Sequence, residues 1–154
     1  MVLPRQGASF LLLALSFLPG VLLGQDRGLR LEGLREGQFR EAELGSGSTV
    51  IVFWASWSPK CRDIVERVNS LTGRLGRGTR LITVDFQEEP VEVERFLKGK
   101  TFSVPVYLDR TGAFAKKYGV TTLPSLLIFR DGKEAYRGSL PADAERLIRE
   151  KLSG

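Results

Sequence analysis

The distribution of apolar and polar residues predicts strands that alternate with helices. Residues 50–54 form an apolar run of β-branched and aromatic side chains, which is typical of a strand buried on both faces. The run ends at the turn Ser56-Trp57-Ser58-Pro59. Beyond this turn, apolar residues recur at helical spacing and predict a helix with one buried face: Ile64, Val65, Val68, Leu71 and Leu75. The pattern therefore predicts a strand–turn–helix unit across residues 49–75, around which the chain is organised.

Similar patterns continue to the C-terminus. Apolar runs predict strands at residues 80–85, 104–109 and 125–129, while residues 90–97, 113–118 and 141–152 read as helices. Asp131-Gly132 supplies the positive φ angles of a type I′ turn, so residues 134–137 are expected to return as an edge strand. This order predicts an α/β fold: a mainly parallel central sheet with helices on both faces and an antiparallel edge hairpin.

The N-terminal segment predicts export. Residues 1–24 carry one early charge, Arg5, and then an apolar run, as in a signal peptide or, if uncleaved, an N-terminal anchor. The run is short for a membrane span, and a buried N-terminal helix is the structural alternative. Residues 25–48 are polar with spaced apolar positions, which fits a lead-in hairpin or a linker before a domain at residues 49–154.

Composition narrows the chemistry. The 154 residues suffice for one domain, and the apolar and charged fractions of 42% and 27% are those of a soluble globular protein. The net charge of +5 comes from basic residues interleaved with acids, so no nucleic-acid partner is expected. With no histidine, one cysteine and one methionine, the chain has no Cys-His pair, no thiolate metal site and no internal disulfide. No metal or other cofactor is expected.

The segment FWASWSPKCR resembles the active-site motif of the thioredoxin superfamily, in the FWA-x-WCPPCR form of its TlpA/ResA-like branch. The phrases YGVTTLP and IFRDGK are similar to that branch's pattern around its cis-proline, and the resemblance covers roughly residues 31–152. It implies a thioredoxin fold with an additional helix and strand near residues 91–108. One position departs from the family: Ser58 replaces the first cysteine, so the motif is S-x-x-C and only Cys61 remains.

Cys61 is the candidate catalytic residue. A cysteine near a helix N-terminus, flanked here by Lys60 and Arg62, is favoured as a thiolate. Cys61 also continues the apolar stripe, however, and burial raises the pKa of a thiol. The resemblance implies the same opposing effect, because the family's second cysteine is the shielded one. Cys61 is therefore either a functional or an inert structural thiol.

The neighbouring motif residues have simpler interpretations. Ser58 is predicted to cap the helix by accepting the N–H of Cys61, and Pro59 suits the first helical position. By resemblance, Pro124 is the cis-proline, Thr122 and Leu123 line a substrate groove, and Trp57 flanks it. A trans proline and a packing tryptophan are the structural alternatives. Glu88 is the nearest candidate acid, although a place at a helix N-terminus explains it equally well.

Two functions follow. The first is an exported TlpA-like protein of thiol–disulfide exchange, an oxidoreductase working through Cys61, with client proteins and an external thiol reductant as partners. It would lie in a bacterial periplasm or outside the cytoplasmic membrane, touching the membrane only through an N-terminal anchor. The second is a redox-inactive module that binds a peptide or protein in the groove. A peroxide-reducing enzyme is weaker, because Cys61 stands elsewhere than the reactive cysteine of the related peroxiredoxins. The exposure and pKa of Cys61 separate the first two.

Overall fold

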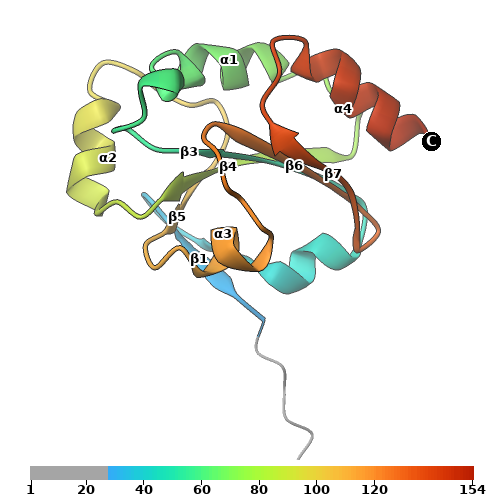
Figure 1. Cartoon of the computed structure of the whole chain (residues 1–154), viewed down its shortest axis with the longest axis horizontal. Coiled ribbons are helices and arrows are strands. Elements are labelled where there is room, and N and C mark those ends of the chain that lie inside the picture. The colour runs from blue at the N-terminus through green and yellow to red at the C-terminus, as the bar shows by residue number, and fades with distance from the viewer. Residues whose placement is uncertain (1–27) are drawn as a thin grey trace, which may run out of the picture.

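A seven-stranded sheet runs through the centre of the molecule, in the order β2-β1-β5-β4-β3-β6-β7 (Figure 1). The structure is a computed structural model that describes residues 28–154. Its strands are β1 (Arg30–Gly33), β2 (Gln38–Arg40), β3 (Ser48–Trp54), β4 (Thr79–Phe86), β5 (Val106–Asp109), β6 (Ser125–Arg130) and β7 (Lys133–Ser139). Its helices are the 3₁₀ segments η1 (Glu41–Gly45) and η2 (Pro59–Cys61), and α1 (Ile64–Leu71), α2 (Pro90–Phe96), α3 (Ala113–Lys117) and α4 (Ala144–Ser153).

The sheet is more mixed than the sequence predicts. Strands β3, β4 and β5 are parallel, whereas β1 with β2, β1 with β5, β3 with β6 and β6 with β7 are antiparallel. Short turns can join only antiparallel neighbours, and such hairpins form both edges of the sheet. The α/β prediction is confirmed, and the parallel pairing is confined to the centre.

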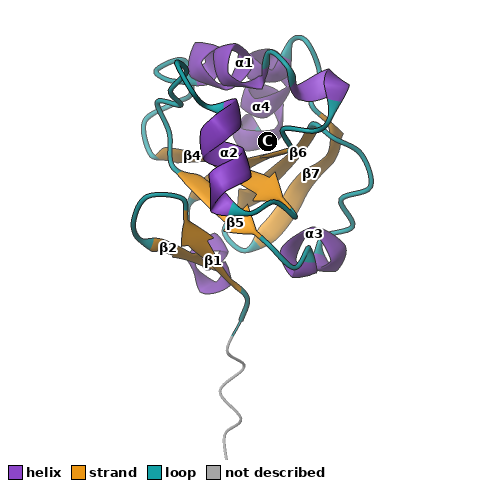
Figure 2. Ribbon diagram, turned by 90° about the vertical axis from the view of Figure 1, so that its left-hand side faces the viewer, coloured by secondary structure: helices purple, strands orange, loops and turns teal. Residues whose placement is uncertain are grey.

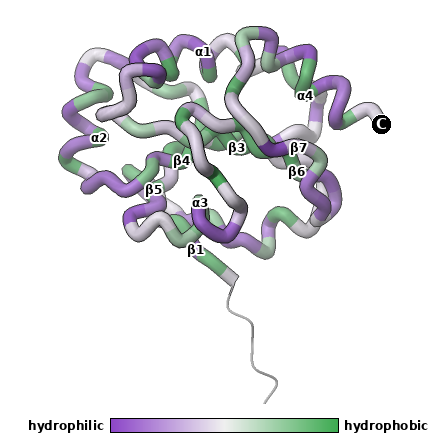
Figure 3. The backbone as a smooth tube through the Cα atoms, viewed as in Figure 1, coloured by the Kyte–Doolittle hydropathy of each residue, from purple (hydrophilic) through white to green (hydrophobic). Residues whose placement is uncertain are grey.

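Helices cover both faces of this sheet. Figure 1 places α1 and α4 on one side, and α3 and η1 on the other, while Figure 2 shows α2 along the β4–β5 end. Alternate residues of β3 supply the two cores: Val50, Val52 and Trp54 pack with α1 and α4, and Ile51 and Phe53 pack toward α3. The central strands are accordingly the hydrophobic part of the chain in Figure 3.

Two predicted helices begin later than expected. Residues 59–61 form a single 3₁₀ turn, and α1 starts only at Ile64 and ends at Leu71, so Leu75 packs from the following turn. At the C-terminus α4 starts at Ala144 rather than at Pro141. The carbonyl oxygens of Leu140 and Pro141 accept hydrogen bonds from the Arg67 guanidinium at 2.9 and 3.3 Å, so the Pro141 carbonyl faces α1 instead of opening a helix.

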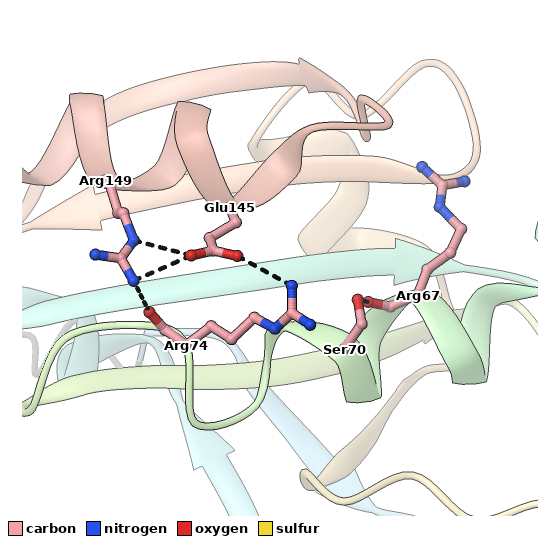
Figure 4. Close-up of polar contacts among 5 residues, drawn as sticks. All are labelled: Arg67, Ser70, Arg74, Glu145 and Arg149. Carbon is pink, nitrogen blue, oxygen red and sulfur yellow. Dashed lines mark hydrogen bonds and ion pairs between the residues drawn. The ribbon is translucent and has the colours of Figure 1, made fainter.

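A polar network joins the end of α1 to α4 (Figure 4). Glu145 pairs with Arg74 at 3.4 Å and with Arg149 at 3.0 Å. Arg149 also donates to the carbonyl oxygen of Arg74 at 2.6 Å, and the Ser70 hydroxyl donates to that of Arg67 at 2.7 Å. These exposed contacts orient α4, whereas the buried side chains beneath it supply most of the packing energy.

Glu41, the first residue of η1, ties the β1–β2 hairpin to the end of α3 on the same side of the sheet. Its carboxylate accepts the backbone N–H of Leu29 at 2.8 Å and the Tyr118 hydroxyl at 2.5 Å, and pairs with Lys117 at 2.6 Å. Burial alone would raise the pKa of Glu41, but these partners lower it below its ordinary value.

The expected signal peptide or anchor, residues 1–24, lies outside the described residues. Within residues 28–154, no helix combines the length and apolar character that a bilayer crossing requires.

Candidate functional site

The S-x-x-C motif lies in the tight connection between β3 and η2. The backbone N–H of Ser58 donates to the carbonyl of Ala55 at 3.2 Å, and that of Cys61 donates to the carbonyl of Ser58 at 2.9 Å. The predicted side-chain cap is therefore wrong: Ser58 precedes η2 with an extended backbone, but its own carbonyl already takes the N–H of Cys61. The Ser58 hydroxyl interacts with the Cys61 thiol instead.

Cys61 is sealed within the domain. Its relative exposure is 0%, and it belongs to the core cluster formed with Trp54, Ile64 and Val65. Burial raises the pKa of the Cys61 thiol above its ordinary value, and the opposing effects of the Ala55 backbone and the Ser58 hydroxyl do not offset it. Since the thiolate is the nucleophile, this conformation holds Cys61 in its less reactive form.

A groove lies directly in front of the motif. The Leu123–Pro124 peptide bond is cis, as the resemblance implies. The hollow beside it has a volume of about 290 Å³ and is lined by Trp57, Ser58, Phe86, Val120, Thr121, Thr122 and Leu123. The ring of Trp57 is 60% exposed and meets that of Phe86 edge-on, with centroids 6.5 Å apart. A wide aromatic surface beside hydroxyl and backbone groups suits an extended polypeptide segment.

The structure brings some of the predicted site residues together and separates others. Trp57, Ser58, Thr122 and Leu123 share the groove. Pro124 is buried behind it, where its carbonyl accepts the N–H of Leu140 at 3.0 Å. Pro59 and Lys60 are exposed on η2 and do not line the hollow. Cys61 does not line the groove: it is buried and interacts with the side chain of Ser58, which does.

Glu88 belongs to the motif loop rather than to a helix terminus. Helix α2 begins at Pro90, with Glu89 and Glu92 forming its capping box. The carboxylate of Glu88, only 5% exposed, accepts the backbone N–H of Ser56 at 2.6 Å and also the Ser56 hydroxyl. The helix-terminus interpretation of Glu88 is therefore wrong, because its carboxylate binds Ser56, the residue before Trp57, and not the first turn of α2.

Asp85 is the polar residue that sequence reasoning missed. It lies on β4, in register with Trp54 of β3, and its relative exposure is 0%. Burial, and then the neighbouring Glu88 carboxyl, raise the pKa of Asp85 to about 9. The sequence did contain one indication of this, because Asp85 is the last residue of a strand predicted to be buried on both faces. A buried acid must be either neutral or paired.

The carboxyl groups of this site do not form a metal centre. Within residues 28–154, no cluster of three or more cysteine, aspartate and glutamate side chains has the arrangement to hold an ion. The site offers one thiol, the hydroxyl groups of Ser56, Ser58, Thr121 and Thr122, and the two buried carboxyl groups of Asp85 and Glu88.

Comparison with known proteins places the chain in a family. The model of the AhpC/TSA family matches residues 28–150. The chain belongs to the AhpC/TSA family. Its relatives include "Thiol-disulfide oxidoreductase ResA" of Bacillus thuringiensis subsp. konkukian, 34% identical over 101 residues that cover 64% of this chain and 58% of the relative. "Sporulation thiol-disulfide oxidoreductase A" of Bacillus subtilis is 27% identical over 104 residues, covering 64% of this chain and 63% of that protein. The chain thus spans about three fifths of the length of these relatives.

Solved structures show that other proteins share this fold. The structure of MTB dsbF superposes with a TM-score of 0.70 at 17% identity and covers 82% of this chain and 95% of that one. The crystal structure of StoA from Bacillus subtilis gives 0.67 at 23% identity, covering 79% and 93%. At these identities the likeness establishes the fold. The thioredoxin-fold prediction is confirmed, and so is the resemblance to the ResA-like thiol–disulfide oxidoreductases.

Proposed function

We propose that this protein takes part in thiol–disulfide exchange with client proteins and reacts through a single thiol, Cys61. Its relatives named thiol-disulfide oxidoreductases support this class of reaction. The observation that carries the proposal is the stacking of the site. Ser58 lines the client groove. Cys61, the single cysteine of the chain, is buried next to Ser58 and interacts with its hydroxyl.

The reaction needs a partner thiol at each turnover. The Cys61 thiolate attacks one sulfur of a client disulfide, forms a mixed disulfide and releases the other client sulfur as a thiolate. A small external thiol then attacks the Cys61 sulfur and releases the client as a dithiol. A second molecule of that thiol regenerates Cys61 and leaves as the external disulfide. Overall, the client gains two electrons and two external thiols lose them.

Access to the sulfur requires a local opening of the motif. Segment η2 is a single turn of three residues whose Pro59 and Lys60 are exposed. Short segments of this kind open at a lower free energy than the surrounding sheet. We propose that a client in the groove displaces Ser58 and thereby uncovers Cys61.

Export is part of the same proposal. The charge and apolar run of residues 1–24 support delivery outside the cytoplasm, to a periplasm or the outer side of the membrane. One neighbour in fold is described as a secreted Mycobacterium tuberculosis disulfide oxidoreductase. Client disulfides are expected in such compartments, where disulfides form and persist.

A second candidate is a redox-inactive module that holds an extended peptide in the groove. It is favoured by one observation, the zero exposure of Cys61 combined with a raised thiol pKa. The groove itself serves both functions, so binding alone does not separate them.

The decisive experiment is capture of a mixed disulfide. The full chain is incubated with glutathione disulfide, or with a disulfide-containing peptide, and analysed by mass spectrometry, with Cys61→Ser as the control. Iodoacetamide alkylation from pH 4 to 10 is measured on the same samples. An adduct on the folded wild type, absent from Cys61→Ser, is the expected result. A thiol that forms no adduct and is alkylated only after denaturation would leave the binding module as the function.

A further inference from the structure

Two acids are buried side by side where β4 ends. Asp85 is 0% exposed and Glu88 is 5% exposed. Gln87, between them, has a φ of +59°, in the left-handed region, so the chain turns sharply after the strand. The two carboxyl groups interact, and that interaction is one of the causes of the raised pKa of Asp85. Two buried carboxyl groups in contact are most stable when they share one proton.

The surroundings of Asp85 favour its neutral form. Neither carboxyl oxygen has an aligned hydrogen-bond donor among the described residues. Its cross-strand neighbours, Trp54 of β3 and Leu108 of β5, carry no charge. The charged side chains that act on it are Glu88 and, from α2, Glu92, and both are negative; the backbone of Glu88 acts in the opposite direction without offsetting them. The shared proton therefore belongs on Asp85.

Glu88 is placed to accept a hydrogen bond from the protonated carboxyl group of Asp85. Its two oxygens accept the backbone N–H and the hydroxyl of Ser56, as expected of a carboxylate, which has no donor of its own. A carboxylate has four lone-pair positions, so it can accept a further O–H from Asp85. An O–H of Asp85 directed at Glu88 would extend these two bonds into a chain from the interior of β4 to the residue before Trp57.

We propose that Asp85 is a positioning residue: as a neutral acid it donates its O–H to Glu88, and Glu88 in turn fixes the loop that carries Trp57 and Ser58. Trp57 is mostly exposed, so the groove wall depends on the backbone of this loop. What the loop binds rests on the proposed function, but the network is a property of the folded chain and can be measured without a client.

The test uses Asp85→Asn, which keeps a neutral hydrogen-bond donor, and Asp85→Leu, which has a similar volume and no donor. All samples carry Cys61→Ser, so that the thiol does not contribute a titration. Hydrogen exchange of the Ser56 amide is followed by NMR at pH 7. Asp85→Asn should keep the protection of the parent within about threefold, and Asp85→Leu should lose at least about tenfold, since a hydrogen bond to a charged group is weakened.

The pH dependence of the Ser56 amide signal separates a hydrogen-bonding role of Asp85 from a packing role, because packing alone would not make the signal titrate. With Asp85 present, the Ser56 amide signal should shift with a midpoint of about 9. With Asp85→Asn the profile should be flat over the same range. A parent signal that does not titrate, or an Asp85→Asn variant that loses as much protection as Asp85→Leu, would overturn the proposal. If Asp85→Leu does not fold, the comparison of the parent with Asp85→Asn decides alone.

These outcomes are separable from those for the proposed function. A titrating Ser56 signal together with no mixed disulfide in the unmodified chain would reject thiol exchange and keep the network. A mixed disulfide together with a flat Ser56 profile would do the reverse.

Discussion

Replacement of Trp57 tests whether the groove binds polypeptide. Trp57 is 60% exposed, and a tryptophan presents about 250 Å² in all, so roughly 150 Å² is available to a ligand. At about 25 cal/mol per Å², complete coverage of that surface contributes up to about 4 kcal/mol, and half coverage about 2 kcal/mol. We therefore expect Trp57→Ala to weaken binding of an extended polypeptide by roughly 30-fold. The edge contact with Phe86 contributes about 0.5–1.5 kcal/mol to folding, so the variant should stay folded.

The probe is reduced, carboxymethylated α-lactalbumin, which is unfolded and has no free thiol, and affinity is measured by calorimetry. Trp57→Phe should retain part of the affinity because it keeps an aromatic face. Val91→Ala is the matched control, since Val91 is 59% exposed but lies on α2 and lines a different hollow. Equal affinities for wild type and Trp57→Ala, or an equal loss in Val91→Ala, would refute the assignment of the groove.

Three further predictions concern the motif, the hairpin and α4. Ser58→Cys should form an internal disulfide with Cys61, seen by mass spectrometry, and should reduce insulin with an external thiol faster than the wild type does; an open dithiol under oxidising conditions would contradict the placement. Glu41→Gln should lower the Tm most at pH 7, because a lowered folded pKa gives stability above the ordinary value of 4.5 that is lost as the pH falls through the folded pKa; an unchanged difference at pH 3 would argue against this. Glu145→Ala should cost under about 1 kcal/mol in urea unfolding because its pairs are exposed, and Ile148→Ala about 2–5 kcal/mol because its side chain is buried; similar costs would contradict the division of roles.

Most of the architecture is readable from the chain because its strands are short apolar runs. Residues 50–54 and 126–129 are apolar on both faces, and only central strands of a covered sheet bury both faces. The Asp131-Gly132 turn is equally direct, since both residues have positive φ angles, +48° and +79°. The cis bond before Pro124 could be predicted only through the family resemblance.

The site was harder to predict because it depends on contacts between distant segments. The sequence pattern shows that Ser58 can cap a helix. It does not show that the Ser58 carbonyl accepts the N–H of Cys61, which leaves the Ser58 hydroxyl to interact with the Cys61 thiol. The role of Glu88 depends on Ser56, which lies 32 positions earlier in the chain. Asp85 looks like the polar end of a strand until β3, β5 and α2 are packed around it. Local patterns specify elements, and these roles arise only when elements meet.

The single buried cysteine also decides how the fold responds to its surroundings. With one cysteine, the chain has no internal crosslink to gain or lose, and the sulfur lies in the core at 0% exposure. Its folding stability therefore does not follow the redox potential of the compartment, as that of a two-cysteine relative would. The described structure contains no disulfide that a reductant could break, so the same fold is expected under oxidising and reducing conditions.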